Sequence, residues 1–193
     1  MNIISGPARG VELCVPEGIP VRPTTGRARK ALFDSLGDLT GTNVLDLFSG
    51  SGALALESLS RNACSAAMVE LELRHVRIIE ENLRRVRGAG VTAPAWIIQA
   101  DALNCAGYLS RLKTVPDLIF ADPPYPISAK SFAALLADDF FCKVLAGSTL
   151  IWEIPDHPGA AGEFITAAKR LDRMNLRRFA GTMFISGEIR YDG

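Results

Sequence analysis

The segment "NVLDLFSGSGALALESL", residues 43–59, constrains the fold more than any other part of the sequence. An apolar run containing Asp46 leads into a turn containing Gly50 and Gly52, and the residues after the turn have helical periodicity. This order of strand, glycine turn and helix is typical of the first unit of an open α/β sheet. Such sheets bind ligands beyond the carboxyl ends of their strands.

After residue 40, short apolar runs alternate with helical patterns. We expect strands at 44–48, 66–70, 96–99, 118–121 and 149–153, and helices near 53–61, 73–87, 102–112 and 129–142. Apolar residues on both faces of the runs favour parallel strands that are buried on both sides. Two final runs, 171–179 and 183–190, are separated by three residues and predict a hairpin. The predicted fold is therefore α/β and Rossmann-like, with a seven-stranded, mostly parallel sheet that ends in an antiparallel hairpin.

The first 40 residues differ from the rest and predict a small N-terminal extension to a main domain of residues 41–193. Residues 3–4 and 11–15 are expected to pair as a hairpin around residues 6–10. A helix should follow, capped by Thr24 or Thr25. Its expected apolar face consists of Ala28, Ala31, Leu32 and Leu36.

Composition limits the classes of function. The 193 residues include 21 basic and 21 acidic ones, so any nucleic-acid contact must come from local clusters of charge. The four cysteines are far apart, and neither histidine lies near one, so we expect neither a metal site nor a disulfide framework. We see no signal peptide and no membrane-spanning stretch, and we expect a cytoplasmic monomer.

The glycine turn alone leaves two ligands open, besides the possibility of a tight turn that binds nothing. Residues 50–55 fit the loose form of the dinucleotide fingerprint G-x-G-x-x-G/A. Glu70 follows Gly52 by 18 residues and could accept hydrogen bonds from ribose hydroxyls in either case. However, Asp46 also suits S-adenosylmethionine (AdoMet), because a carboxylate there can face the amino group and the sulfonium.

The segment "LIFADPPYPIS", residues 118–128, distinguishes between the two ligands. It follows the fourth strand, so Asp122, Pro123, Pro124 and Tyr125 should emerge at the same sheet edge as the glycine turn. Two prolines make a stiff loop that offers carbonyl oxygens. Asp122 and the Pro123 carbonyl can both accept from one exocyclic amine of a nucleobase, and Tyr125 can stack on the extruded base. A dehydrogenase does not need this loop, so the sequence favours AdoMet over NAD.

Asp101, which follows the third strand, is a further cofactor candidate. Its carboxylate could accept from the adenine N6 amine, with the Ala102 N–H nearby. A plain helix N-cap before Ala102 is an equally good and compatible interpretation.

Together these residues resemble the RsmD family, bacterial methyltransferases that act on a guanine N2 amine of small-subunit ribosomal RNA. The resemblance covers nearly the whole chain and rests on the segments "NIISGPARGVELCVP", "RPTTGRARKALFDSL", "DLFSGSGALALESLSR", "ADPPY", "WEIP" and "RRFAGTMFIS". It implies AdoMet as cofactor, S-adenosylhomocysteine as product, and 16S rRNA, within the 30S subunit or an assembly intermediate, as partner.

The resemblance also implies roles for individual residues. Residues 122–125 would be catalytic. The cofactor would be bound by Asp46, Ser49, Gly50, Gly52, Glu70, Asp101 and Ala102. The basic segment 22–30, which contains no acidic residue, would contact RNA through Arg22, Thr24, Thr25, Arg27, Arg29 and Lys30.

Three departures from the family pattern occur at Asn2, near Pro7 and at Asn62, and none of them lies in the two motifs. Two alternatives remain. A DNA amino-methyltransferase would use the same motifs, but 193 residues leave no separate domain for reading base edges. A non-catalytic RNA-binding assembly factor would have little use for paired amine acceptors at residues 122–125.

Overall fold

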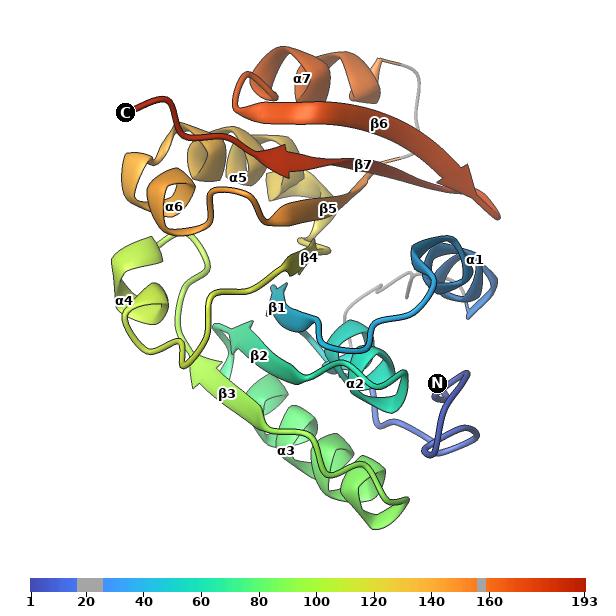
Figure 1. The fold of residues 1–193 in the computed structure, drawn as a ribbon. Helices are drawn as coiled ribbons and strands as arrows, with labels where there is room; N and C mark the ends of the chain where they lie inside the picture. The colour runs from blue at the N-terminus through green and yellow to red at the C-terminus, as the bar shows by residue number, and fades with distance from the viewer. Residues whose placement is uncertain (17–25, 156–158) are drawn as a thin grey trace.

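The computed structural model describes residues 1–16, 26–155 and 159–193. The predicted fold class is confirmed, because these residues form a seven-stranded sheet in the order β3-β2-β1-β4-β5-β7-β6 (Figure 1). The strands are β1 Asn43–Leu47, β2 Ser65–Glu70, β3 Ala95–Gln99, β4 Leu118–Ala121, β5 Thr149–Ile154, β6 Leu171–Phe179 and β7 Thr182–Ile189. Strands β1 to β5 run parallel to one another, and β7 runs antiparallel to both β5 and β6.

Helices cover both faces of the sheet (Figure 1). They are α1 Gly26–Leu36, α2 Ala53–Ser60, α3 Leu73–Gly88, α4 Cys105–Leu109, α5 Tyr125–Ala137, α6 Asp139–Val144 and α7 Ala160–Ala167. One buried cluster joins α1, α2 and α3 to the sheet, and the other joins α4 to α7 to the opposite face. Strands β1, β2, β4 and β5 are buried because apolar side chains project from both of their faces, whereas the edge strand β3 is largely half-buried and the edge strand β6 is mostly exposed.

Two predicted helices were wrong in extent, and one helix was not predicted. The helix expected at 102–112 is only α4, because it begins after a turn at Asp101. The helix expected at 129–142 begins at Tyr125 and is divided at Asp138, whose side chain accepts from the Phe141 N–H at 2.8 Å and starts α6. No helix was expected at α7, a short element that follows Gly159.

The N-terminal segment, residues 1–16, pairs antiparallel around residues 6–10, as expected, but forms no regular strands, and it is held against α2 and α3. Its pairing is limited to an isolated bridge between Asn2 and Glu12 and a few backbone hydrogen bonds. The Ile4 N–H donates to Glu57 Oε2 at 2.7 Å, and the Ala8 N–H donates to Ser60 Oγ at 3.1 Å. Its apolar side chains therefore join the same buried cluster as α1, α2 and α3.

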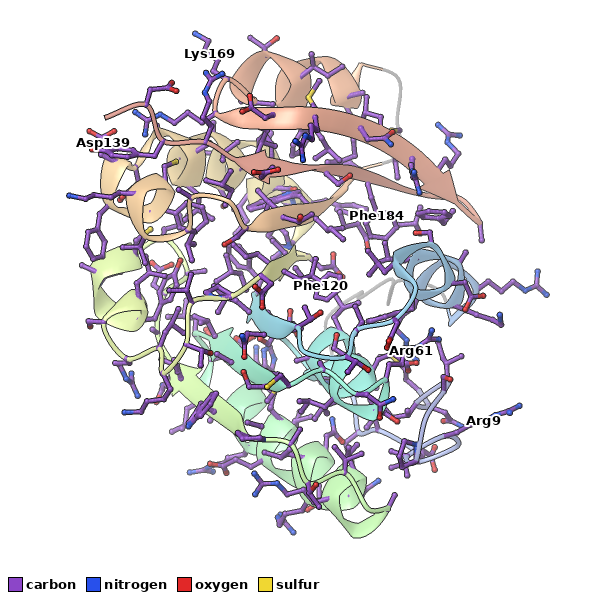
Figure 2. All side chains as sticks on the ribbon, in the orientation of Figure 1. Arg9, Arg61, Phe120, Asp139, Lys169 and Phe184 are labelled. Atoms are coloured by element: carbon purple, nitrogen blue, oxygen red, sulfur yellow. The ribbon has the colours of Figure 1, made fainter. Side chains whose placement is uncertain are left out.

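Helix α1 buries a wider face than the sequence predicted, because Arg29 and Phe33 are buried together with Ala28 and Leu32. Phe33 packs against Phe120 of β4, with 5.6 Å between ring centroids. Figure 2 shows Phe120 and Phe184 on the side of the sheet that faces α1. This packing brings α1 beside the carboxyl edge of β1 and β4, where the site lies.

Candidate active site

The turn after β1 has a backbone that only certain residues adopt readily. Phe48, Gly50 and Gly52 all have positive φ, of 59°, 56° and 75°. A Cβ on Gly52 would lie 3.1 Å from Met68 Sδ and 3.2 Å from Ile79 Cγ2, whereas at Gly50 its nearest neighbour would be Phe48 O at 3.9 Å. Glycine is therefore required at position 52 both by the backbone conformation and by the packing. At position 50, the absence of a side chain leaves the backbone accessible from the pocket. A bulky residue at positive φ, as at Phe48, is typical of a functional turn.

Glu70, at the end of β2, is fixed against this turn. Its Oε2 accepts from the Gly50 N–H at 2.8 Å, and its Oε1 accepts from the Glu72 N–H at 2.9 Å. His75 Nδ1 of α3 lies 3.4 Å from the same Oε1, and both side chains are buried. Nothing in the sequence connects His75 with the site, because a lone histidine on an apolar helix face resembles a core residue.

Asp46 is a buried carboxylate beneath the turn. It is 2% exposed, and its Oδ2 accepts from the Ala55 N–H at 3.2 Å. Burial raises the pKa of Asp46 to about 7; the Ala55 hydrogen bond opposes this effect, and the nearby Glu70 charge adds to it. Ser49 Oγ donates to the Asp46 carbonyl at 2.6 Å and ties the start of the turn to the strand.

Asp122 comes directly after β4, which is hydrogen-bonded to β1, so the two motifs meet at one sheet edge. Side chains and backbone of Asp46, Ser49, Gly50 and Asp122 line a common pocket of about 110 Å³. The sequence predicted this meeting because the carboxyl ends of neighbouring parallel strands share an edge.

Tyr125 begins α5, and its hydroxyl donates to Glu153 Oε1 at 3.1 Å. Glu153 is buried at the end of β5, whereas Tyr125 is 39% exposed. Trp152 Nε1 donates to Ser128 Oγ at 2.9 Å and ties the first turn of α5 to β5. The hydrogen bond of its hydroxyl therefore fixes the position of Tyr125, while part of the side chain remains exposed at the surface. Glu153 could be singled out from the sequence only within the segment "WEIP". Its hydrogen bond with Tyr125 could not be predicted there, because it depends on which strands are neighbours in the sheet.

Asp101 and Ala102 lie after β3 and do not line the pocket. The Asp101 carboxylate accepts from the Leu103 N–H at 2.9 Å within a turn, and Asn104 occupies the N-cap position of α4. The N-cap interpretation of Asp101 was therefore wrong. Ala102 is buried, while Asp101 and Leu103 are exposed, as is Leu71 after Glu70.

Comparison with known proteins identifies the family of this chain. A family model described as "Conserved hypothetical protein 95", which corresponds to the RsmD family, matches residues 1–156. The chain belongs to this family.

Two curated relatives of this RsmD-family chain are named ribosomal RNA small subunit methyltransferase D. The one from Escherichia coli K12 is 34% identical over 126 residues, which cover 65% of this chain and 60% of the relative. The one from Haemophilus influenzae is 30% identical over 147 residues, covering 74% of each chain. The match thus spans less than two thirds of the length of the Escherichia coli relative.

Solved structures support the fold. A hypothetical protein of Thermus thermophilus superposes with a TM-score of 0.74 and 29% identity, covering 98% of this chain and 99% of that one. The rRNA methyltransferase aviRa of Streptomyces viridochromogenes has a TM-score of 0.67 and 17% identity, with 94% and 91% covered. At that identity the second likeness shows the Rossmann-like fold alone.

In this RsmD-family chain the basic segment expected to contact RNA is divided. Arg22, Thr24 and Thr25 lie outside the described residues. Arg27 and Lys30 are exposed on α1, whereas Arg29 is 2% exposed and lines the pocket beside Asp46. The structure therefore does not offer Arg29 as a surface contact for RNA, because helical periodicity turns its side chain inward.

Two features are absent from the described part of the chain. Residues 1–16, 26–155 and 159–193 contain no group of three or more His, Cys, Asp or Glu side chains that could hold a metal ion. Within the same ranges, no helix has the length and apolar character needed to cross a bilayer.

Proposed function

We propose that this chain is an AdoMet-dependent methyltransferase that acts on the exocyclic N2 amine of a guanine in 16S rRNA. The observation that carries the proposal is the common pocket lined by Asp46, Ser49, Gly50 and Asp122, with Tyr125 presented at the same sheet edge. The names of the curated relatives support the rRNA substrate.

The residues at this edge fit AdoMet. The pocket is open to solvent, and its volume of about 110 Å³ is below the range of about 300–1,000 Å³ that is usual for ligand pockets, so the nucleoside would extend past it towards Glu70. Exposed Leu71 and Leu103 offer apolar surface for an adenine, next to the Asp101 carboxylate. AdoMet, when bound, supplies an activated methyl group and leaves as S-adenosylhomocysteine.

The contribution of the protein would be positioning and electrostatics. Asp122 and the Pro123 carbonyl would accept hydrogen bonds from the guanine amine, so that its nitrogen lone pair is less delocalised into the ring. Tyr125 would stack on the extruded base, and its bond to Glu153 keeps the ring in place with little loss of entropy on binding. Pro124 at the N-cap of α5 stiffens the loop between them.

The RNA would approach over the start of α1. Arg27 and Lys30 are exposed there and can neutralise phosphates, and Arg22, Thr24 and Thr25 precede them in the chain. Because the formal net charge is zero, we expect these local contacts to be supplemented by an assembled 30S particle.

The deciding experiment is transfer of labelled methyl groups from AdoMet to 30S subunits, naked 16S rRNA and duplex DNA, followed by digestion to nucleosides. N2-methylguanosine from the ribosomal substrates alone is the expected result. Methyladenine or methylcytosine in DNA would instead favour the DNA amino-methyltransferase. RNA binding without any transfer would favour the non-catalytic assembly factor.

A variant tests the role of Asp122. Asp122→Ala should lower methyl transfer by about 100-fold or more while AdoMet binding, measured by calorimetry, changes little. Asp172→Ala, at an exposed aspartate of β6, is the control and should leave both unchanged. Loss of AdoMet binding in Asp122→Ala with the control intact would place Asp122 in cofactor binding and refute its proposed contact with the amine.

A further inference from the structure

We propose that Arg29 binds the carboxylate of the amino-acid end of the cofactor, an inference that rests on the proposed AdoMet dependence. The sequence grouped Arg29 with RNA-contacting residues, and nothing in the family resemblance assigned it to a particular atom of the cofactor. The geometry of the pocket points to this more specific role.

The first observation is the position of Arg29. It lies one turn into α1, is 2% exposed, and lines the same pocket as Asp46, Gly50 and Asp122. An arginine is almost never fully buried unless its charge is paired. The two neighbours on the same turn, Arg27 and Lys30, remain exposed. The burial of Arg29 is therefore specific to its side of the helix.

The second observation is that the guanidinium lacks a strong partner among the described residues. One nitrogen donates to the Asn2 carbonyl, another meets Met1 Sδ, which is only a weak acceptor, and the buried Nε has no partner. Burial lowers the pKa of Arg29, an effect that the nearby Glu57 charge only partly opposes. The Glu57 carboxylate itself accepts from the Ile4 N–H and from Arg61 Nε.

A buried cation of this kind is stabilised by an anion that arrives with the ligand. The pocket also holds the buried carboxyl group of Asp46, which suits an ammonium. Its residues are thus complementary to a zwitterion, with the ammonium towards Asp46 and the carboxylate towards Arg29. A pocket of about 110 Å³ is also of the size to take this end of AdoMet alone.

A purely structural role for Arg29, as an anchor for the N-terminal segment, is the competing explanation. Both roles predict weaker AdoMet binding in an Arg29 variant, so affinity for AdoMet alone does not separate them. Decarboxylated AdoMet does, because it keeps the adenosine, the sulfonium and the amine and lacks only the carboxylate. Only a direct contact makes the preference for AdoMet over this analogue depend on Arg29.

The experiment measures dissociation constants of AdoMet, S-adenosylhomocysteine and decarboxylated AdoMet by calorimetry for the wild type, Arg29→Gln and Arg29→Lys. The wild type should prefer AdoMet to the decarboxylated analogue by about 10- to 100-fold. Arg29→Gln should bind both with nearly the same low affinity, and S-adenosylhomocysteine should weaken in parallel. Arg29→Lys should retain part of the preference, because it keeps the charge but loses the bidentate geometry.

The control is Arg9→Gln, an exposed arginine of the N-terminal segment that points outward in Figure 2. It should keep the full preference. Equal affinity of the wild type for AdoMet and its decarboxylated analogue would overturn the inference even if no variant folded, and so would an undiminished preference in Arg29→Gln. Failure of the wild type to bind AdoMet at all is a different result, which would overturn the proposed function itself.

Discussion

Replacing Asp46 with asparagine tests the buried carboxylate beneath the glycine turn through the pH dependence of stability. Burial raises the pKa of Asp46 from its usual 3.8 to about 7 in the folded protein, and the Glu70 charge contributes to this. Between these two values the folded chain binds more protons at this position than the unfolded chain does. The contribution of Asp46 to the free energy of unfolding is therefore fully present below pH 3.8, falls as pH rises, and is constant above about pH 7.

The size of this fall follows from the difference between the two pKa values. Each pH unit corresponds to about 1.36 kcal/mol, so ionisation of Asp46 should lower the stability of the wild type by about 4 kcal/mol between about pH 4 and pH 8. An asparagine at position 46 has no charge to bury and can still accept from the Ala55 N–H. Its added amide group needs an acceptor, and leaving it unsatisfied costs about 1–3 kcal/mol at every pH.

The assay is urea unfolding of the wild type and Asp46→Asn at intervals from about pH 4 to pH 8. The difference in free energy of unfolding between the two proteins includes the cost of the unsatisfied asparagine amide, which does not depend on pH. The quantity to compare is therefore the change of this difference with pH. The stability of Asp46→Asn relative to the wild type should rise by about 4 kcal/mol over this range. Glu80→Gln, at an exposed carboxylate of α3, should follow the wild type. If the free energies of unfolding of the wild type and Asp46→Asn change with pH in parallel, the raised pKa of the buried Asp46 carboxyl group is refuted.

Three further predictions concern the N-terminal segment, the catalytic loop and the linkage of Asp46 to cofactor binding. A Cβ on Gly6 would lie 1.4 Å from a backbone oxygen of α2, whereas one on Gly10, also at positive φ, would meet nothing within 4 Å. Gly6→Ala should therefore destabilise by about 2–5 kcal/mol and Gly10→Ala by only about 1–2 kcal/mol in urea unfolding; equal losses would contradict the docking of this segment. Tyr125→Phe removes the hydrogen bond to Glu153 but keeps the ring, so methyl transfer should fall by less than about tenfold, against about 10- to 100-fold for Tyr125→Ala, in single-turnover assays. If the AdoMet ammonium lowers the pKa of Asp46, binding near pH 7 should release a fraction of a proton, detectable as a calorimetric enthalpy that changes with the ionisation enthalpy of the buffer.

The strands and the meeting of the two motifs could be predicted from sequence because both follow from local pattern and one topological rule. Apolar runs of four or five residues located β1, β2, β4 and β5 to within one residue at each end. Once the strands were parallel, Asp46 and Asp122 had to come near one edge. No long-range information beyond strand adjacency was needed.

Helix ends were harder to predict because they depend on side chains competing for backbone N–H groups. Pro123 and Pro124 suggested an extended loop through Tyr125, but a proline is compatible with the residue just before a helix. The break at Asp138 depends on its bond to the Phe141 N–H, and a continuous apolar pattern conceals it. Contacts between residues far apart in the sequence, such as that of Tyr125 with Glu153, leave no signal in the local sequence.

The basic cluster before and within α1 shows why a count of charges was insufficient. In the sequence, Arg27, Arg29 and Lys30 form one group without an acidic residue. In the helix, successive side chains are separated by about 100°, so Arg27 and Lys30 lie about 60° apart, whereas Arg29 lies about 160° from Arg27 and about 100° from Lys30. The structure accordingly leaves the first two exposed and buries the third beside Asp46. One turn of α1 thus carries both a candidate phosphate contact and a candidate cofactor contact. If the proposed contacts are correct, a shift of this turn on RNA binding would also move Arg29 in the pocket and would couple RNA binding to cofactor binding.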